Sequence, residues 1–192
     1  PRIAMVPGLS ADDDGVPDVM RGEEVQIFGA VALTGIRDGL FVLPGTHNKW
    51  VRVIDGRVAG FRTFMTGEFY ALLSQHSILA RTLEADAALD EPAFLRGVAR
   101  AGGDQGLLHN AFGVRALGLF GRLSPIQSAS YLSGLLIGEE LRGQELPAGR
   151  EIIAIGAPAL TARYALALGQ RDIRVRCFGA EATWAGVRTL QT

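Results

Sequence analysis

Residues 40–65, LFVLPGTHNKWVRVIDGRVAGFRTFM, decide the fold because they predict three consecutive β-strands. Residues 40–43 form a short apolar run, which is typical of a buried strand. Residues 50–54 and 58–65 alternate apolar and polar side chains, and Asp55-Gly56 between them is a strong two-residue hairpin signal. The stretch therefore predicts an antiparallel meander of three strands.

The residues before this meander predict a strand, a loop and a helix. Residues 2–6 (RIAMV) are apolar after the leading arginine and precede a Pro-Gly break, which favours a short strand. Residues 10–18 are rich in aspartate and are interpreted as a solvated loop. An EF-hand calcium loop is excluded, because counting from Ser10 puts Arg21 where the bidentate glutamate must lie. A helix over about 19–33 follows, with Asp18 as its N-cap.

The residues after the meander predict helices first and then alternating strands and helices. Phe69, Leu72, Leu73 and Ile78 supply the apolar stripe of a helix from Thr66 to about residue 79. Further helices are expected over 91–120 (broken at Gly102-Gly103), 125–142, 158–168 and 181–190, and further strands over 152–155 and 173–177. This order predicts an α/β fold of the ribonuclease-H-like kind, with a mixed sheet flanked by helices.

The composition of the chain excludes several classes of protein. Of 192 residues, 48% are apolar and 20% are charged, so the chain can build a core and is not disordered. A net charge of −1 argues against a nucleic-acid partner, and no apolar run approaches the length of a membrane span. Cys177 is the only cysteine, which suits a reducing cytoplasm. Pro1 is not a natural start, so further residues are expected before it.

The turn after the first strand of the meander carries the strongest chemical signal. Residues 44–50 read PGTHNKW and place a hydroxyl, an imidazole, an amide and an ammonium within four positions of a glycine turn. Exposed N–H groups and such side chains are typical of a phosphate-binding turn. Lys49 is the only lysine of the chain, which favours a retained point charge there. The alternative is an ordinary polar hairpin.

Two further positions are candidates, each with a structural alternative. Asp18 is a candidate general base, or only a helix N-cap. Gly156-Ala157-Pro158 joins a strand to a helix at the carboxyl end of the strand, where α/β proteins bind nucleotides, or it is a plain connection. Neither a Walker A motif nor a G-x-S-x-G elbow is present, and the three histidines lack zinc-ligand spacing.

Taken together, these motifs resemble the 2-dehydro-3-deoxygalactonokinase family, the sugar-acid kinases of galactonate degradation. The resemblance runs in one order along almost the whole chain, and its first three motifs are specific to the family. The segments that carry it are residues 6–10 (VPGLS), 17–24 (PDVMRGEE), 43–50 (LPGTHNKW), 64–68 (FMTGE) and 130–138 (SYLSGLLIG).

The resemblance implies an actin/hexokinase-like kinase with two ribonuclease-H-like lobes and a cleft between them. Residues 1–16 would then end the N-terminal lobe, and residues 17–192 would form the C-terminal, nucleotide-binding lobe. The Asp-x-Gly-Thr phosphate loop of the first lobe would lie before Pro1. On this expectation the 192 residues alone are inactive.

The resemblance also implies roles for particular residues. Asp18 corresponds to the catalytic base. The other candidates fall into three groups: phosphate-binding Gly45, Thr46, His47, Asn48 and Lys49; sugar-acid-binding Arg21, Glu23 and Glu24; and nucleotide-binding Gly156, Ala157 and Pro158. Family members often have serine where this chain has Asn48, although an amide can also donate to phosphate. The resemblance assigns no role to Thr66 or Glu68 and identifies no metal ligand.

The activity that the resemblance implies is ATP-dependent phosphorylation of 2-dehydro-3-deoxy-D-galactonate to its 6-phosphate, with Mg²⁺ on the nucleotide. The expected partners are the sugar acid and ATP, with no nucleic acid and no membrane, and the expected assembly is a homodimer. Two alternatives remain open. One is a kinase of the same superfamily that acts on another sugar or sugar acid, and the other is a non-catalytic nucleotide-binding module.

Overall fold

The computed structural model describes residues 5–12, 15–84, 86–146, 149 and 151–190. The chain divides into two compact units. The first, called the sheet unit here, comprises residues 1–64, 149–165 and 172–192. The second, called the helical unit, comprises residues 65–148 and 166–171.

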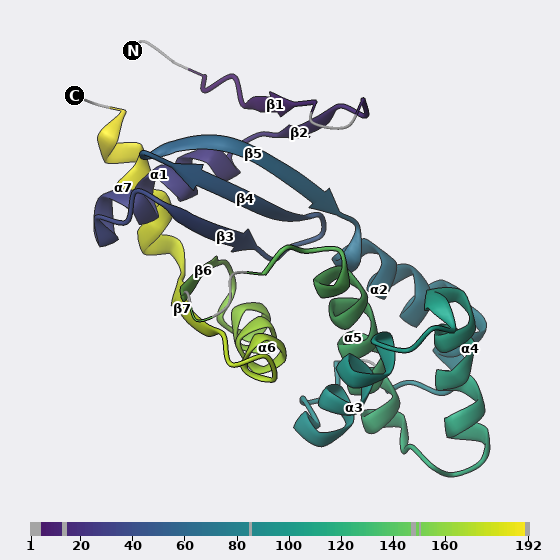
Figure 1. The fold of residues 1–192 in the computed structure, drawn as a ribbon. Helices are drawn as coiled ribbons and strands as arrows, with labels where there is room; N and C mark the ends of the chain where they lie inside the picture. Colours follow the sequence, from purple (N-terminus) through teal and green to yellow (C-terminus); the bar gives the residue numbers. More distant parts are fainter. Residues whose placement is uncertain (1–4, 13–14, 85, 147–148, 150, 191–192) are drawn as a thin grey trace. The chain divides into compact units, whose positions relative to one another are not determined.

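The sheet unit is built on a five-stranded mixed sheet of order β5-β4-β3-β6-β7 (Figure 1). Its strands are β3 (Gly39–Leu43), β4 (Asn48–Ile54), β5 (Arg57–Phe64), β6 (Glu151–Ile155) and β7 (Arg174–Phe178). The first three strands pair antiparallel, while β6 pairs parallel with both β3 and β7. Asp55 and Gly56 turn the second hairpin with φ of 50° and 72°, as a type I′ turn requires. The predicted meander and the ribonuclease-H-like sheet are thus confirmed.

Helices cover both faces of this sheet. Helices α1 (Glu23–Thr34) and α7 (Ala180–Thr189) pack on one face, where Ile27 and Ala182 join the core cluster of alternate strand residues. On the opposite face lies the first part of α6 (Pro158–Gly169), whose Tyr164 ring centroid is 6.4 Å from that of Trp50. Because successive residues of a strand point to opposite faces, the sheet buries apolar side chains on both.

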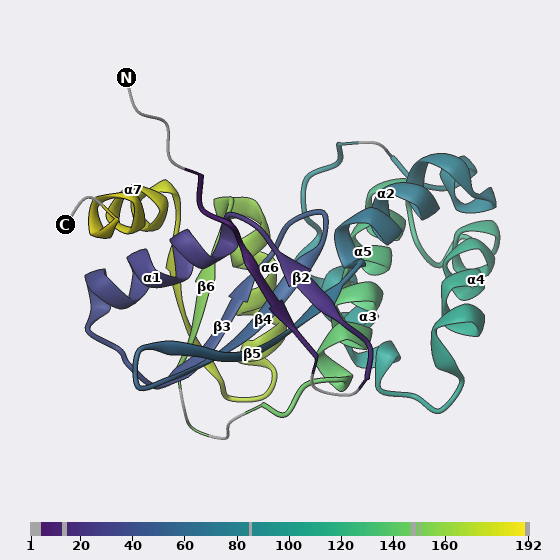
Figure 2. The same ribbon diagram turned by 90° about the horizontal axis from the view of Figure 1, so that it is seen from above.

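A two-stranded ribbon, β1 (Leu9–Ala11) with β2 (Asp18–Met20), crosses the sheet unit (Figure 2). The prediction that a helix begins at about residue 19 with Asp18 as its N-cap is therefore wrong. Pairing with β1 holds residues 18–20 extended, and α1 begins only after Gly22, which has φ of 102°. Of the strand predicted over 2–6, residues 2–4 lie outside the described residues, and residues 5 and 6 are not in a strand.

The acidic loop predicted over 10–18 is shorter than expected. Its first two residues belong to β1 and its last to β2. Asp13 and Asp14 lie outside the described residues. The Asp12 carboxylate accepts a hydrogen bond from Gly15 N at 3.0 Å, so the described part of the loop is a local turn between the two strands.

The helical unit contains the predicted helices with small changes at their ends. Its elements are α2 (Thr66–His76), the 3-10 turn η1 (Ile78–Arg81), α3 (Glu91–Ala101), α4 (Gly106–Leu119) and α5 (Pro125–Arg142). The break at Gly102-Gly103 is confirmed, and a capping box between Ser124 and Gln127 begins α5. Helix α5 is central, because Leu132 and Leu135 are fully buried in the core of this unit.

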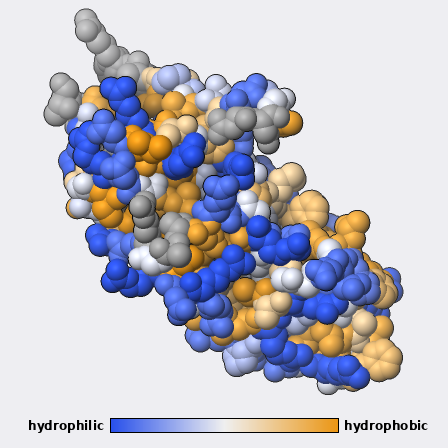
Figure 3. Space-filling view, in the orientation of Figure 1, coloured by the Kyte–Doolittle hydropathy of each residue, from blue (hydrophilic) through white to orange (hydrophobic). Residues whose placement is uncertain are grey.

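Apolar side chains are also exposed on the helical unit (Figure 3). Phe69 and Leu72, from the stripe predicted for α2, are 38% and 45% exposed, and α2 has no fully buried residue. The most exposed apolar side chains on α4 are those of Leu108, Leu119 and Phe112. None of the helices described here has both the length and the apolar character needed to cross a membrane.

Helices α3 and α5 pack so closely that glycine is required at their contact. A Cβ atom at Gly134 would lie 1.9 Å from Phe94 O, and one at Gly97 would lie 2.1 Å from Tyr131 O. Since both neighbours are backbone atoms, a side chain could be accommodated only if the helices moved apart.

We therefore expect Gly134→Ala to lower the free energy of unfolding by about 1–3 kcal/mol, measured by urea denaturation. Gly113→Ala is the matched control, because a Cβ atom at this helical position meets nothing within 4 Å. That variant should instead be stabilised by up to about 1 kcal/mol, since alanine is the better helix former. Equal effects of the two substitutions would contradict the tight packing.

Candidate functional site

The candidate site lies where β3 and β6 end at the same edge of the sheet. These two strands are parallel neighbours, and the chain order runs outward from them in opposite directions. Ligands of open α/β sheets bind at the carboxyl ends of the strands at such a switch point. Here the two following turns come into contact, because a Cβ atom at Gly156 would lie 3.1 Å from Pro44 O.

A cavity of about 420 Å³, called the turn cavity, opens at this edge. The turn after β3 lines it with Gly45, Thr46 and His47, and the turn after β6 lines it with Gly156. Residues 21–23, at the beginning of α1, complete its wall. The structure thus brings together predicted phosphate-binding, nucleotide-binding and sugar-acid-binding residues that are far apart in the sequence.

The buried side chain of Asn48 stabilises the turn after β3. Its Oδ1 accepts a hydrogen bond from Gly45 N at 2.7 Å, and its Nδ2 donates to the Tyr164 hydroxyl at 2.5 Å. The Asn48 side chain is only 2% exposed and does not line the turn cavity. These contacts point to a structural part for Asn48, so its predicted contact with phosphate finds no support in this geometry.

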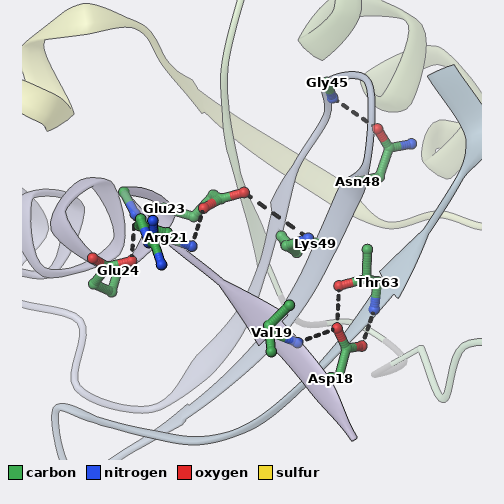
Figure 4. Close-up of polar contacts among 10 residues, drawn as sticks. Asp18, Val19, Arg21, Glu23, Glu24, Gly45, Asn48, Lys49 and Thr63 are labelled. Atoms are coloured by element: carbon green, nitrogen blue, oxygen red, sulfur yellow. Dashed lines mark hydrogen bonds and ion pairs between the residues drawn. The ribbon is translucent and has the colours of Figure 1, made fainter. Parts of the chain in front are cut away.

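Lys49 points to the other face of β4. Its ammonium Nζ lies 4.0 Å from Glu23 Oε1, although the residue is only 5% exposed (Figure 4). A second cavity of about 570 Å³, called the ribbon cavity, is lined by Lys49, Arg21, Glu23 and His47 together with Ser10 and other ribbon residues. Lys49 does not line the turn cavity.

The two carboxylates at the start of α1 differ in their surroundings. Glu23 Oε2 accepts a hydrogen bond from Arg21 N at 2.9 Å, and Glu23 lines both cavities. Glu24 Oε2 accepts from Gly22 N at 2.7 Å, but this residue is 4% exposed and lines neither cavity. Its Oε1 has no hydrogen-bond partner among the described residues. The position of Glu24 therefore favours bracing the first turn of α1 rather than contacting a sugar acid.

Asp18 connects the ribbon to β5. Its Oδ1 accepts hydrogen bonds from Val19 N at 2.7 Å and from the Thr63 hydroxyl at 2.5 Å, and its Oδ2 accepts from Thr63 N at 2.6 Å (Figure 4). These three donors fix the orientation of the carboxylate. Asp18 lines neither cavity itself, but Val19, Met20 and Arg21, which follow it, line the ribbon cavity.

The remaining predicted residues lie elsewhere. Ala157 and Pro158 follow Gly156 in sequence but line neither cavity. Thr66, whose role the sequence leaves open, donates a hydrogen bond to Glu140 Oε2 within the helical unit. Glu68 lies in the first turn of α2, where a carboxylate suits the helix dipole.

Sequence reasoning missed Thr63, Tyr164 and Ser10. Thr63 is separated from Asp18 by 45 positions and Tyr164 from Asn48 by 116, and both are ordinary residues of a strand and a helix. Thr63 lies two residues after the partner of Val51 in β5, so alternation puts its side chain on the same face of the sheet as the core residue Val51. This alternation is the only sequence signal that could have predicted where the Thr63 side chain points. No motif marks Tyr164, and Ser10 ends the segment at residues 6–10 that carries the family resemblance, which attaches no role to it.

The site offers little for direct metal binding. Among the residues that the structure describes, no three histidine, cysteine, aspartate or glutamate side chains come together as a metal site would require.

We expect Asn48→Ala to lower the free energy of unfolding by about 1–3 kcal/mol, because it removes the buried hydrogen bonds that Asn48 forms with Gly45 N and with the Tyr164 hydroxyl. Denaturant unfolding measures this effect. Thr46→Ala, in the same turn but exposed, is the control and should change stability by less than about 0.5 kcal/mol. A wild-type midpoint for Asn48→Ala would show that Asn48 does not hold the turn.

Comparison with known proteins gives consistent matches along the chain. Residues 1–190 match the family described as 2-keto-3-deoxy-galactonokinase. A Rhizobium meliloti (strain 1021) protein named probable 2-dehydro-3-deoxygalactonokinase is 40% identical over 191 residues, covering 96% of this chain and 62% of that protein. An Escherichia coli (strain K12) protein named 2-dehydro-3-deoxygalactonokinase is 36% identical over 192 residues, covering 98% and 65%.

A solved structure agrees with these matches. The crystal structure of a Sinorhizobium meliloti protein that bears the name 2-dehydro-3-deoxygalactonokinase superposes with a TM-score of 0.85 at 40% identity, covering 95% of this chain and 62% of that one. The chain thus spans somewhat less than two thirds of the length of the relatives it matches. It belongs to the 2-keto-3-deoxy-galactonokinase family.

Proposed function

We propose that the protein transfers the γ-phosphoryl group of ATP to the 6-hydroxyl group of 2-dehydro-3-deoxy-D-galactonate, in the breakdown of galactonate. The observation that carries this proposal is the family match over residues 1–190. The turn cavity supports it, because a glycine turn and a second strand-to-helix turn meet there at the carboxyl ends of parallel strands.

In this proposal the turn after β3 binds the β- and γ-phosphate oxygens. The backbone of Gly45, the hydroxyl of Thr46 and the imidazole of His47 are at or near the surface of the turn cavity. Gly156, with Ala157 and Pro158 after it, borders the adenosine. A bound nucleotide can approach the backbone closely at Gly156, since no side chain stands in its way.

The chemical step needs a proton acceptor and little else from the protein. The substrate hydroxyl oxygen forms a bond to the γ-phosphorus, the bond from that phosphorus to the bridging oxygen breaks, and ADP leaves with the electron pair. Asp18 accepts the hydroxyl proton. Its three hydrogen bonds hold the carboxylate in one orientation, and a carboxylate oxygen can accept more than one bond.

The sugar acid is proposed to lie in the ribbon cavity. Arg21 is well suited to its carboxylate, because a guanidinium forms two parallel hydrogen bonds with such a group. Glu23 lines the same cavity and can accept hydrogen bonds from sugar hydroxyls. Glu24 is expected to act indirectly, by bracing the first turn of α1 through Gly22 N.

Several features of the whole protein belong to the same proposal. Mg²⁺ would reach the site on the ATP phosphates and neutralise part of their charge. Residues 1–16 would end an N-terminal lobe and residues 17–192 would form the C-terminal lobe. A cytoplasmic location fits an enzyme that consumes ATP and this sugar acid, and a homodimer stays a prediction.

Substituting the proposed base tests the mechanism. We expect Asp18→Asn in the full-length protein to lower kcat by about 10²–10⁴, because the amide cannot accept the proton. ADP affinity, measured by calorimetry, should stay at the wild-type value. Asp12→Asn is the control, because Asp12 follows β1 and its carboxylate accepts a hydrogen bond from Gly15 N. Wild-type turnover by Asp18→Asn would remove Asp18 from the mechanism.

A substrate panel tests the reaction itself. The full-length protein should release ADP with 2-dehydro-3-deoxy-D-galactonate at a kcat/KM at least tenfold above that for other sugars and sugar acids. A higher value for another sugar acid would assign the protein to another kinase reaction. If the protein releases ADP with none of these compounds, the remaining candidate function is that of a non-catalytic nucleotide-binding module.

A further inference from the structure

We infer that Lys49 binds the carboxylate of the sugar acid together with Arg21, rather than the nucleotide phosphates that its place beside the glycine turn suggests. The inference rests on the proposed function and deepens it, since it names the pair of cations that would select an acid over a neutral sugar. It is carried by the direction of three consecutive side chains in β4.

The first step is the alternation of β4. Asn48 and Trp50 both reach Tyr164 of α6, so they point to one face of the sheet. Lys49 lies between them and must point to the opposite face. Asn48 accepts a hydrogen bond from Gly45 N, so its side chain is linked to the turn. Lys49, the next residue of the same predicted phosphate-binding motif, points to the other face of the sheet.

The second step is the cross-strand register. Leu43 of β3 and Thr63 of β5 lie directly opposite Lys49 on either side, and opposite residues share a face with Cβ atoms about 4.5–5.5 Å apart. Leu43 belongs to the core cluster under α1. Thr63 holds the Asp18 carboxylate through two hydrogen bonds. The ammonium therefore shares its face with the proposed proton acceptor.

The third step is charge. A buried ammonium needs a partner, and Lys49 has the Glu23 carboxylate at 4.0 Å. This separation is longer than a hydrogen bond, and an ammonium has three donors. A ligand carboxylate between Lys49 and Arg21 would accept hydrogen bonds from both cations. Glu23 then acts as a positioning residue that holds the ammonium at the cavity wall.

The fourth step is a comparison of the two cavities. Arg21, Glu23 and His47 line both of them, but Lys49 lines only the ribbon cavity. With two basic side chains, Arg21 and Lys49, and one carboxylate, Glu23, the lining of this cavity has an excess of positive charge that matches a monoanionic substrate. Its volume of about 570 Å³ is in the usual range for small-molecule sites.

Two separate affinities, measured by calorimetry on the full-length protein, test the inference. Lys49→Met should weaken binding of 2-dehydro-3-deoxy-D-galactonate by about 10–100-fold, the usual effect of losing a hydrogen bond to a charged group. ADP affinity should change less than about twofold. Arg52→Met, which removes an exposed cation from the same strand, is the matched control and should alter neither affinity.

A neutral analogue sharpens the result. The C1 amide of the sugar acid should bind wild type and Lys49→Met about equally weakly, because the charge that Lys49 recognises is missing. Lys49→Arg, which keeps the charge, should keep more sugar-acid affinity than Lys49→Met if both variants retain the wild-type urea midpoint. Equal losses in the methionine and arginine variants would overturn the inference.

The other outcomes separate this inference from the proposed function. Weaker ADP binding by Lys49→Met, with sugar-acid affinity unchanged, would assign Lys49 to the phosphates and overturn the inference while the kinase reaction stands. Unchanged affinity for both ligands would also overturn it. If the wild-type protein binds neither ligand, the proposed function itself fails.

Discussion

The parallel pairing of β3 with β6 is the constraint on which the candidate site depends. It puts Leu43 and Ile155, the last residues of two strands more than a hundred positions apart in sequence, at one edge of the sheet. The turn after each strand must then leave the sheet at the same place. Because Gly156 has no side chain, the two turns approach each other closely and leave a cavity at their outer surface.

The same strand geometry divides the chemistry between two sides of β4. Asn48 points toward α6 and fixes the turn through Gly45, while Lys49 points toward α1 and the ribbon. A strand cannot direct neighbouring side chains to one ligand on one face. A phosphate site at the turn and a carboxylate site beside the ribbon are therefore adjacent, with Arg21, Glu23 and His47 on the wall they share.

The sequence predicts most of the fold because its signals are local. Alternation and the Asp55-Gly56 turn define the meander, and Ser124 with Gln127 marks the start of α5. The helix after Asp18 begins four residues late because pairing with β1, a contact outside the segment itself, holds those residues extended. The bonds of Asp18 with Thr63 and of Asn48 with Tyr164 depend on register and on helix placement, which no local pattern encodes.

The ribbon shows how a wall of the site can be rigid without belonging to the main sheet. Met20 is buried in the core under α1, and Asp18 is bonded to the backbone and the side chain of Thr63. One apolar and one polar anchor thus hold β2 at two of its three residues. Arg21 follows directly, and Arg21 N is bonded to Glu23. A guanidinium carried by a segment fixed in this way loses little further backbone entropy when it binds an anion, which favours geometric selection of the ligand.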